Sequence, residues 1–457
     1  MLIVNGLVAL PGSASPARTD IRVEGERITE IAPDLAALPG EELVDATGLI
    51  VLPGAIDPHV HFDTPGFTQR EDFLHGSSEA ARGGVTTVVD MPCTSLPPVI
   101  SPENLEIKLA AVAPLAVVDY GFYGGLHGLV PMAAKAQELE AAMEALAPRV
   151  LGFKCYLLSG METFPRVNHE ELGRAIAKAD ALNRPLLLHA EDADYVSAAQ
   201  KTIKDARGSG VPTWDDYVDS RPEAAERVAC AAAVTLALGH EGSLHVVHVG
   251  TAEAAEAVAS AGSTCETCAH YLAFSREDFA AKGSSLKTAP PVKARGQADR
   301  LWKLLADGTI AFVTSDHAPA LAEEKRSGSV WTDYGGIPGT GTMLPYLFSE
   351  GYLAGRLSLA RFLEVVSSAA ARRYGLWARK GSIETGKDAD LVLIDPKATS
   401  TVSGEFLYSK GHDTPFECMR LNGSIRSTWL RGQKIYDADN GICIKPGYGR
   451  FLTWGYT

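Results

Sequence analysis

Apolar residues along the chain form three zones of different periodicity. In residues 1–55, short apolar segments alternate with polar residues and are separated by turns, a pattern typical of antiparallel strands. The stretch VEGERI sets a turn between two such segments and predicts a hairpin. Residues 376–457 return to the same β-rich texture, so we expect the two ends of the chain to pair into one small β-sandwich domain.

The middle zone, residues 56–375, has the pattern of a barrel. Nearly continuous Val, Leu and Ile segments such as VTTVVDMP and PLLLHAE alternate with segments rich in Ala and Glu. This alternation indicates a parallel sheet covered by helices. The unit repeats about eight times over about 300 residues, so the predicted fold class is α/β: a (β/α)8 TIM-type barrel with the small β-sandwich attached.

Composition excludes several other classes of protein. The chain has 457 residues, 46% of them hydrophobic, which is enough for a large buried core. Its net charge of −14 repels phosphate backbones and anionic membranes, so we expect neither nucleic acid nor membrane as a partner. The start MLIVNGLVALPG lacks a basic region and predicts a strand, not a signal peptide. Seven scattered cysteines suggest reduced thiols in a cytoplasmic protein.

The first candidate chemistry lies in the segment GLIVLPGAIDPHVHF. Residues i and i+2 of a strand share a face, so His59 and His61 should point the same way. Two neighbouring imidazoles make half of a transition-metal site. The alternative is a pair of histidines that are satisfied by hydrogen bonds within a strand.

Lys154 lies within the apolar segment VLGFKCYLL, where an ammonium group is costly to bury. The side chain could reach solvent from the end of the strand. A desolvated neutral amine could instead react with carbon dioxide to form a carbamate, an anionic ligand whose two oxygens can bridge two metals. The sequence leaves both alternatives open.

Three further candidates stand at the ends of predicted strands, where barrel enzymes place their catalytic groups. His189 ends the segment PLLLHAE. In SLHVVHVG, His245 and His248 are three residues apart and should face opposite sides, so we expect only His248, nearer the strand end, to face the site. Asp316 closes TIAFVTSD; it could bind a metal and act as a general base, or it could cap the following helix.

The candidates fall at apparent ends of strands 1, 4, 5, 6 and 8 of the predicted barrel, and the interval from the first to the last matches the usual span of roughly 250 residues. Chance would not place all of them at strand ends, so together they favour a metal site. The predicted ligands are His59, His61, Lys154, His189, His248 and Asp316.

In this order, the motifs HxH, GFK, LLLHAE, HVVHV and TSDHAP resemble those of the cyclic amidohydrolases of the amidohydrolase superfamily. That group contains dihydroorotase, allantoinase, hydantoinase and dihydropyrimidinase. The resemblance covers nearly the whole chain, from LPGAIDPHVH to KGSIETGKDADLVLID. It implies hydrolysis of a ring C–N bond in a small cyclic amide, and a homo-oligomer that is a dimer or a tetramer.

The resemblance also implies two divalent transition metals: zinc, or alternatively iron, cobalt or manganese. His59 and His61 would hold one metal, and His189 and His248 the other. N6-carboxylated Lys154 and a hydroxide would bridge the two metals. Asp316 would be both a ligand and the general base that passes a proton to the leaving ring nitrogen.

Departures from the family pattern reduce the number of candidate substrates. Dihydroorotases carry an arginine two residues after the second metal histidine to bind the substrate carboxylate; Asp63 stands there and would repel that group. Dihydropyrimidinases and D-hydantoinases carry a tyrosine five residues after the metal lysine, where this chain has Ser159. Tyr156 is in a different register, so we expect it to face elsewhere.

Allantoinases fit the pattern best, through GFKCY, YVDSRPEAAE, TCETCAHYL, LKTAPPVK and YGGIPG. One feature differs: they usually have an asparagine in the loop after strand 2, where this chain has Cys93 and Thr94. L-Hydantoinases share CExxxxYL and the ending GYGRFLT, so a hydantoinase-type imide hydrolase is the alternative. The resemblance implies that backbone atoms of Ala289 and Gly335 contact the substrate. Asp63 and Ser159 are the other predicted substrate contacts. The alternative is that the turns at Ala289 and Gly335 only reverse the direction of the chain.

Other motifs point less directly to function. Cys265 and Cys268 have the spacing of a zinc or redox pair, but no second pair lies at zinc-ribbon distance, so a structural role is favoured. We expect His270 to pack beneath the site, while His317 could either orient Asp316 or line the pocket. A non-enzymatic scaffold that has lost its metal ligands is disfavoured, because no ligand position is missing.

Overall fold

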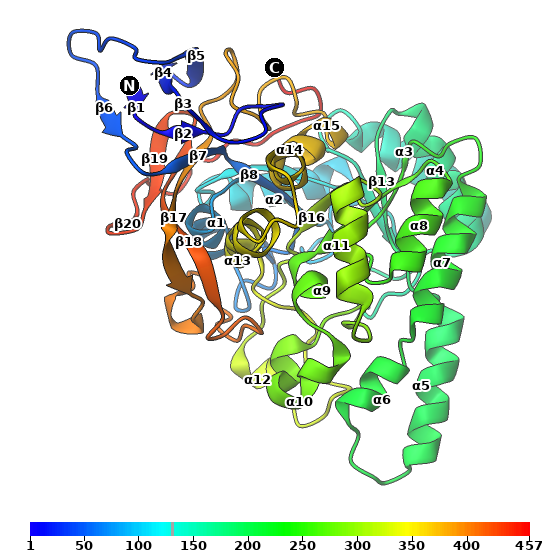
Figure 1. Cartoon of the computed structure of the whole chain (residues 1–457). Coiled ribbons are helices and arrows are strands. Elements are labelled where there is room, and N and C mark those ends of the chain that lie inside the picture. Colours follow the sequence, from blue (N-terminus) through cyan, green and yellow to red (C-terminus); the bar gives the residue numbers. More distant parts are fainter. Residues whose placement is uncertain (129–131) are drawn as a thin grey trace.

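The computed structural model describes residues 1–128 and 132–457 and contains a helix-wrapped barrel beside a β-rich region (Figure 1). Every pairing among the barrel strands is parallel, in chain order. The barrel strands are β8 (Ala55–Val60), β9 (Val85–Asp90), β10 (Asp119–Phe122), β11 (Gly124–Gly125), β12 (Phe153–Tyr156), β13 (Leu186–His189), β14 (Leu244–Val246), β15 (Thr264–Cys268) and β16 (Phe312–Thr314).

The ring of strands closes on itself. Strands β10 and β11 are separated only by Tyr123 and form one continuous segment of the ring. At the other end, a parallel bridge joins Val60 of β8 to His317, just after β16, and the His61 amide donates to the His317 carbonyl at 2.8 Å. The described residues therefore form the α/β barrel that the sequence predicts.

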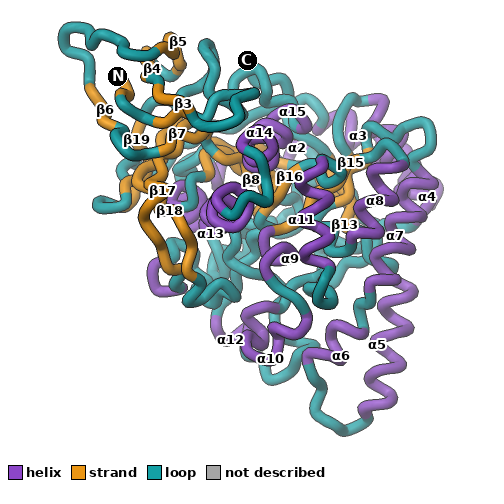
Figure 2. The backbone as a smooth tube through the Cα atoms, in the orientation of Figure 1, coloured by secondary structure: helices purple, strands orange, loops and turns teal. Residues whose placement is uncertain are grey.

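Helices follow the barrel strands and cover them from outside (Figure 2). Several begin at side-chain caps: Asp72 accepts from the His75 amide, and Asn168 and Glu171 form a capping box. The helices are α1 (Phe73–Arg82), α2 (Pro102–Val112), α3 (Met132–Leu146), α4 (His169–Ala181), α5 (Ala193–Arg207), α6 (Trp214–Asp219), α7 (Glu223–Leu236), α8 (Ala252–Ser260), α9 (Ala269–Ala273), α10 (Phe279–Lys282), α11 (Gln297–Asp307), α12 (Ala322–Lys325), α13 (Thr340–Tyr346), α14 (Leu359–Leu363) and α15 (Ala369–Arg373).

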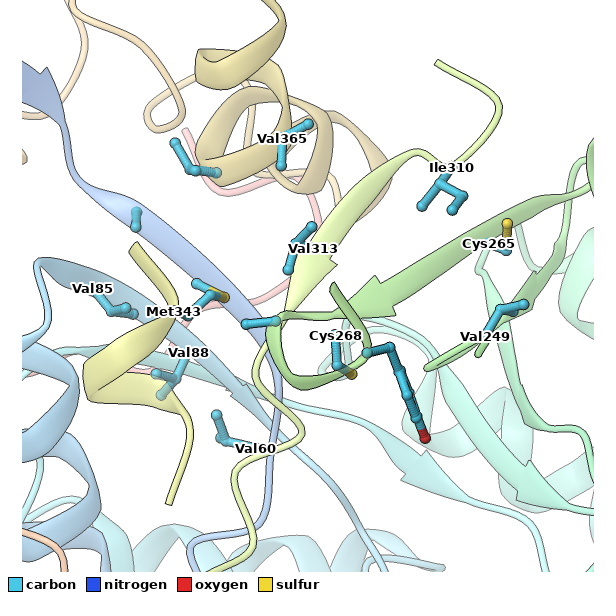
Figure 3. Close-up of a cluster of buried hydrophobic side chains, with 14 of the residues drawn as sticks. Val60, Val85, Val88, Val249, Cys265, Cys268, Ile310, Val313, Met343 and Val365 are labelled. Atoms are coloured by element: carbon cyan, nitrogen blue, oxygen red, sulfur yellow. The ribbon is translucent and has the colours of Figure 1, made fainter. Parts of the chain in front are cut away.

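Buried Val, Ile and Met side chains fill the space between the barrel strands and this helical layer (Figure 3). Val60, Val88 and Val313 from the strands meet Met343 of α13 and Val365 from the segment after α14 in one cluster. This apolar packing holds the carboxyl ends of the strands in place, and those ends carry the site described below.

The two ends of the chain share one sheet, as predicted. Strand β7 (Ile50–Pro53) pairs antiparallel with β17 (Leu391–Thr401), so Val51 lies opposite Leu393. The seven-stranded sheet runs β20-β19-β18-β17-β7-β2-β3, and a second sheet runs β5-β4-β1-β6. The remaining strands are β1 (Leu2–Val4), β2 (Leu7–Val8), β3 (Ala17–Arg18), β4 (Asp20–Glu24), β5 (Arg27–Ala32), β6 (Leu43–Asp45), β18 (Arg420–Leu430), β19 (Gln433–Asp437) and β20 (Gly441–Ile442).

The predicted hairpin in VEGERI is present, because β4 and β5 pair antiparallel up to Glu24 opposite Arg27. Boundaries at 55/56 and 375/376 stay a prediction. A buried ionic cluster ties the C-terminal segment to the barrel: Lys380 Nζ lies 2.8 Å from Asp119 of β10 and 2.7 Å from Asp390. None of the described helices is long and apolar enough to cross a membrane.

Candidate metal centre and substrate pocket

His59, His61 and Asp316 converge at the carboxyl ends of β8 and β16. His59 Nε2 lies 3.2 Å and His61 Nε2 lies 3.4 Å from Oδ1 of Asp316. The ligand atoms of all three residues are within 4.8 Å of one another, close enough to hold one metal ion. Asp316 has φ +48°, a left-handed conformation that is uncommon for a non-glycine residue.

Glu266 of β15 fixes the orientation of His59. Its Oε1 lies 2.7 Å from His59 Nδ1, a contact that engages Nδ1 and leaves Nε2 to face Asp316. The same carboxyl group accepts from Thr314 Oγ1 at 3.2 Å. Sequence reasoning missed Glu266, although a lone carboxylate inside the apolar strand TCETC was a signal that it needs buried partners.

Electrostatics at these three residues suit a cation. Burial raises the pKa of Asp316, but His59, His61 and His248 outweigh burial and hold that pKa well below its usual range. Burial lowers the pKa of His61, but Cys93 and Asp316 outweigh it and raise that pKa to about 10. A positive charge is therefore favoured between His61 and Asp316, and a metal ion in place of the proton would keep the same attraction.

His189 and His248 form a second pair of facing imidazoles. Nδ1 of His189 lies 2.9 Å from Nε2 of His248, and the two ring centres are 4.7 Å apart. The other nitrogen of His189, Nε2, lies 3.0 Å from Oε2 of Glu191, which also accepts from Arg221. This contact turns Nδ1 of His189 toward His248, so the pair presents two nitrogens that could share one metal ion.

Lys154 is buried on β12. Burial, together with the positive charge of Lys154, lowers the pKa of His59, His189 and His248. Among the described residues, its Nζ has no hydrogen-bond partner, and it lies 4.8 Å from the centre of the Tyr156 ring. Burial lowers the pKa of the amine to about 8. A buried, unpartnered amine is costly, whereas a carbamate on that nitrogen would gain metal partners, so the residues present fit a two-metal centre.

The prediction that His245 faces away from His248 is wrong. Nε2 of His245 lies 3.1 Å from Oε2 of Glu266, whose other oxygen bonds His59, so His245 shares the interior of the barrel. Strand β14 ends at Val246, and His248 has φ +42°. The alternation of faces therefore stops before His248, and both imidazoles point inward. His245 supports Glu266, as a structural histidine would.

A pocket of about 400 Å³ opens over the histidines. Ser159, Ala289 and Gly335 line it, as does Thr94, whose Oγ1 lies 3.3 Å from His61 Nδ1. The substrate roles predicted for Ser159, Ala289 and Gly335 stay predictions. The lining residues are His59, His61, Thr94, Tyr156, Leu158, Ser159, Gly160, Met161, His189, Gln200, Tyr217, Arg221, His248, Lys287, Ala289, Asp316, Ala318, Trp331, Thr332, Asp333, Tyr334 and Gly335.

Tyr156 also lines this pocket, so the expectation that it faces elsewhere is wrong. It lies two residues after Lys154 on the same strand and therefore on the same face. Its ring centre is 5.1 Å from that of His189, and its hydroxyl lies 3.0 Å from Cys93 Sγ. The register differs from that of a tyrosine five residues after the lysine, but the side chain still lines the site.

The loop that carries Gly335 packs against the turn that carries Ala289. The Gly336 amide donates to the Lys287 carbonyl at 2.9 Å, and a Cβ at Gly336 would lie 2.2 Å from the Ala318 carbonyl oxygen. Only glycine allows this close approach. The backbone at Gly335 and Ala289 is thereby brought to the same wall of the pocket.

Asp63 is buried next to the pocket, and it is absent from the pocket lining. It has φ +51°, and among the described residues its Oδ1 has no hydrogen-bond partner. Burial raises the pKa of the Asp63 carboxyl to about 8, against the attraction of Arg70. The predicted substrate contact at Asp63 stays a prediction.

The remaining motif residues pack around the site. Nε2 of His317 lies 3.3 Å from Glu71, and its Nδ1 accepts from the Thr340 amide, so His317 holds the barrel closure and does not line the pocket. His270 is buried, with its ring 4.3 Å from that of Tyr271. Cys265 and Cys268 are free thiols within the apolar cluster of Figure 3, in agreement with a structural role.

Known proteins resemble this chain over its full length. A family model described as the amidohydrolase family matches residues 50–435. The chain is 37% identical to an allantoinase from Rubrobacter xylanophilus, over 99% of this chain and 97% of that protein. It is 34% identical to an allantoinase from Enterococcus faecalis, over 97% of each.

Solved structures with the same fold carry related names. An L-hydantoinase (dihydropyrimidinase) from Arthrobacter aurescens matches with a TM-score of 0.91 at 28% identity, over 99% of both chains. A dihydropyrimidinase from Brevibacillus agri matches with a TM-score of 0.89 at 29% identity, over 100% of this chain and 98% of that chain.

Proposed function

The chain belongs to the amidohydrolase family and is a cyclic amidohydrolase, and from this premise we propose that it opens the ring of allantoin to give allantoate. The family resemblance expected from the sequence is confirmed. The observation that carries the proposal is the convergence of Asp316 with His59 and His61 on the floor of a pocket, in a chain that matches allantoinases from end to end.

We propose a centre of two divalent transition metals, with zinc first and iron, cobalt or manganese as alternatives. His59 and His61 would hold one ion, His189 and His248 the other, and the carbamate of Lys154 would bridge them, with Asp316 as a further ligand. When bound, such ions activate water and polarise a carbonyl group. The unpartnered Nζ of Lys154 and the inward-facing nitrogens of the histidines support this assignment.

Asp316 would move the proton during ring opening. Water adds its oxygen to the ring carbonyl carbon, the bond from that carbon to the ring nitrogen breaks, and one water proton ends on the nitrogen. The Asp316 carboxylate accepts that proton and delivers it. Its depressed pKa keeps it ionised at neutral pH, so it is ready as an acceptor. Ring opening by this route needs no serine or cysteine nucleophile.

The pocket walls would hold the flat ring against the metal-binding floor. Backbone atoms at Ala289 and Gly335 lie on one wall, where no side chain of Gly335 obstructs the substrate. Ser159 lines the pocket, but its hydroxyl donates to the Phe164 carbonyl at 2.6 Å. We propose that Ser159 shapes the pocket. We also propose that a carboxylated ring such as dihydroorotate is disfavoured because Asp63 stands where dihydroorotases carry an arginine; since burial raises the pKa of Asp63 to about 8, the missing cation and not a repelling charge carries this proposal.

A hydantoinase-type imide hydrolase is the second candidate. The structural match to an L-hydantoinase at a TM-score of 0.91 favours it, as does Cys93 in place of the asparagine usual in allantoinases. The dimer or tetramer implied by the resemblance belongs to the same proposal and can be read from the mass of the protein in solution.

A hydrolysis panel tests the proposal. The purified protein, with its metal content measured, is given allantoin, hydantoin, 5-substituted hydantoins, dihydrouracil, dihydroorotate and a simple cyclic imide. We expect the highest kcat/KM for allantoin and about two metal ions per chain. Faster turnover of 5-substituted hydantoins would favour the second candidate, and faster turnover of dihydroorotate would show that Asp63 does not exclude a carboxylated ring.

A further inference from the structure

One wall of the pocket carries two cationic side chains that both lie against the ring of Tyr217. The guanidinium carbon of Arg221 is 5.9 Å and Nζ of Lys287 is 4.7 Å from the centre of that ring. All three residues line the pocket. The Tyr217 hydroxyl donates to the Thr288 carbonyl at 2.7 Å, which anchors the ring beside the turn that carries Ala289.

Arg221 retains hydrogen-bonding capacity that the chain does not use. A guanidinium group has five N–H donors. Among the described residues, Arg221 donates through Nη1 to Oε2 of Glu191. Glu191 also bonds His189, so a single carboxylate links the Arg221 guanidinium to a proposed metal ligand. The other N–H groups remain for an acceptor that enters the pocket.

Lys287 is the second hydrogen-bond donor on this wall, and its hydrogen bonds go to backbone carbonyl groups. Its Nζ donates to the carbonyl oxygens of Asp333 and Trp331. The side chain is 4% exposed, so its charge is sheltered from water on the pocket wall. A polar acceptor arriving from the pocket would give the ammonium group a third hydrogen-bond partner.

These donors suit the arm of the substrate better than its ring. The ring-opening step uses Asp316 and the metal-binding side chains, and it leaves Arg221 and Lys287 without a role. A ureido group is neutral and carries one carbonyl oxygen with two lone pairs, together with N–H donors. The side-chain amide of Gln200 lines the same pocket and offers an oxygen to those N–H groups.

We propose that Arg221 and Lys287 determine specificity by donating hydrogen bonds to the carbonyl oxygen of an exocyclic ureido substituent on the hydantoin ring. This inference rests on the proposed hydrolysis of allantoin and extends it, since it names the part of the substrate that the protein recognises. A ring with an apolar arm would leave the unused N–H donors of both side chains without a partner in the pocket, so it would bind less well.

The test compares two substrates on the same protein. Allantoin and 5-methylhydantoin share the ring and differ in the arm, so the ratio of their kcat/KM values reports on the arm. We expect Lys287→Met and Arg221→Lys each to lower this ratio by about tenfold or more. Arg221 also contacts Glu191, so its replacement can weaken the metal centre, but such a loss affects both substrates and cancels in the ratio.

Arg276→Gln is the matched control. Arg276 pairs with Asp215 and Asp219 of α6, the helix that leads to Arg221, and it does not line the pocket. Its replacement removes one arginine charge near the same segment, and the ratio should stay within about twofold of the wild-type value.

The outcomes separate this inference from the proposed function. Allantoin hydrolysis with unchanged ratios in both pocket variants would overturn the assignment of Arg221 and Lys287 alone. A preference for 5-carboxyethylhydantoin over allantoin, lost in the same variants, would show that the two cations bind a carboxylate and would also overturn it. Hydrolysis of 5-methylhydantoin without any hydrolysis of allantoin would contradict the proposed function itself.

Discussion

Oε1 of Glu266 lies 2.7 Å from Nδ1 of His59, and the opposite oxygen of the same carboxyl group lies 3.1 Å from Nε2 of His245. One buried carboxyl group on β15 thus holds imidazoles from two other strands, β8 and β14. Because Nδ1 of His59 is engaged, Nε2 is left to face Asp316, which is the arrangement a metal ligand requires.

Replacement of Glu266 should therefore weaken metal binding. In Glu266→Gln, an amide that can turn its NH2 group toward His59 no longer fixes the tautomer, so we expect metal affinity to fall by about 10- to 100-fold. Competition with a chromogenic chelator measures this directly, without reference to activity.

Glu79→Gln is the control for the loss of a buried carboxylate. Glu79 is buried on α1 and pairs with Arg82, away from the histidines. That variant should lose stability and keep its metal affinity. Unchanged metal affinity in Glu266→Gln would mean that Glu266 serves packing only.

Lys154 provides the second prediction, on metal removal and rescue. Lys154→Ala should lose about half or more of its bound metal and nearly all activity, because the proposed bridging carbamate is gone. A short carboxylic acid such as acetate or propionate should fill the gap and restore part of both. Metal analysis and activity at increasing acid concentration check this expectation.

Cys155→Ala supplies the comparison on the next residue. Cys155 is equally buried on β12, but it packs in the apolar cluster on the opposite face of the strand. The Cys155→Ala variant should keep its metal content and show no response to the added carboxylic acid. Full metal content in Lys154→Ala would refute the bridging role.

The barrel and most positions around the pocket could be predicted because they depend on local rules. Alternation of apolar strands and helices predicts the barrel, and the strand ends predict where His59, His189 and Asp316 meet. The sequence also indicates that the chain ends pair, since both carry strands with too little apolar surface to fold alone.

The errors came from places where the backbone leaves regular geometry or where the partner is distant in sequence. His248 has φ +42°, which resets the alternation of faces and lets His245 point inward as well. The family position five residues after Lys154 says nothing of Tyr156, which the strand period of two places on the same face as Lys154. Glu266 and His59 are 207 residues apart, and no local pattern reports such a contact.

Lys325 carries a prediction on stability and pH. Burial lowers the pKa of this lysine to about 7, from 10.5 as the ordinary value. Between these two values the unfolded chain binds more protons than the folded chain, so stability should rise with pH across that window. Below about pH 7 the folded protein bears the cost of a buried ammonium group.

Lys325→Met should flatten this dependence. We expect the difference in urea midpoint between pH 7 and pH 9.5 to be smaller in the variant than in the wild-type protein. Lys201→Met removes an exposed lysine that pairs with Asp205, and it should leave the wild-type slope. Equal slopes in Lys325→Met and wild type would show that Lys325 is not buried as a titrating group in solution.

The hydroxyl of Tyr156 is the subject of the last prediction. It lies 3.0 Å from Cys93 Sγ, and a thiol is a weak hydrogen-bond partner, so the hydroxyl can turn to a stronger acceptor when a carbonyl group enters the pocket. Tyr156→Phe keeps the ring that packs 5.1 Å from His189 and removes only this donor. We expect kcat/KM for allantoin to fall by about 10- to 100-fold while metal content is retained.

Cys93→Ala distinguishes the two members of this pair. It removes the thiol and leaves the hydroxyl of Tyr156 in the pocket, so it should retain kcat/KM within about threefold if the hydroxyl donates to the substrate. The comparison depends on steady-state kinetics with metal content measured for each variant.

If Cys93→Ala and Tyr156→Phe lose activity equally, the hydrogen bond between the two side chains shapes the pocket and the hydroxyl makes no separate contact with substrate. If neither loses activity, the hydroxyl has no role in turnover, and the pocket position of Tyr156 reflects packing of its ring on His189.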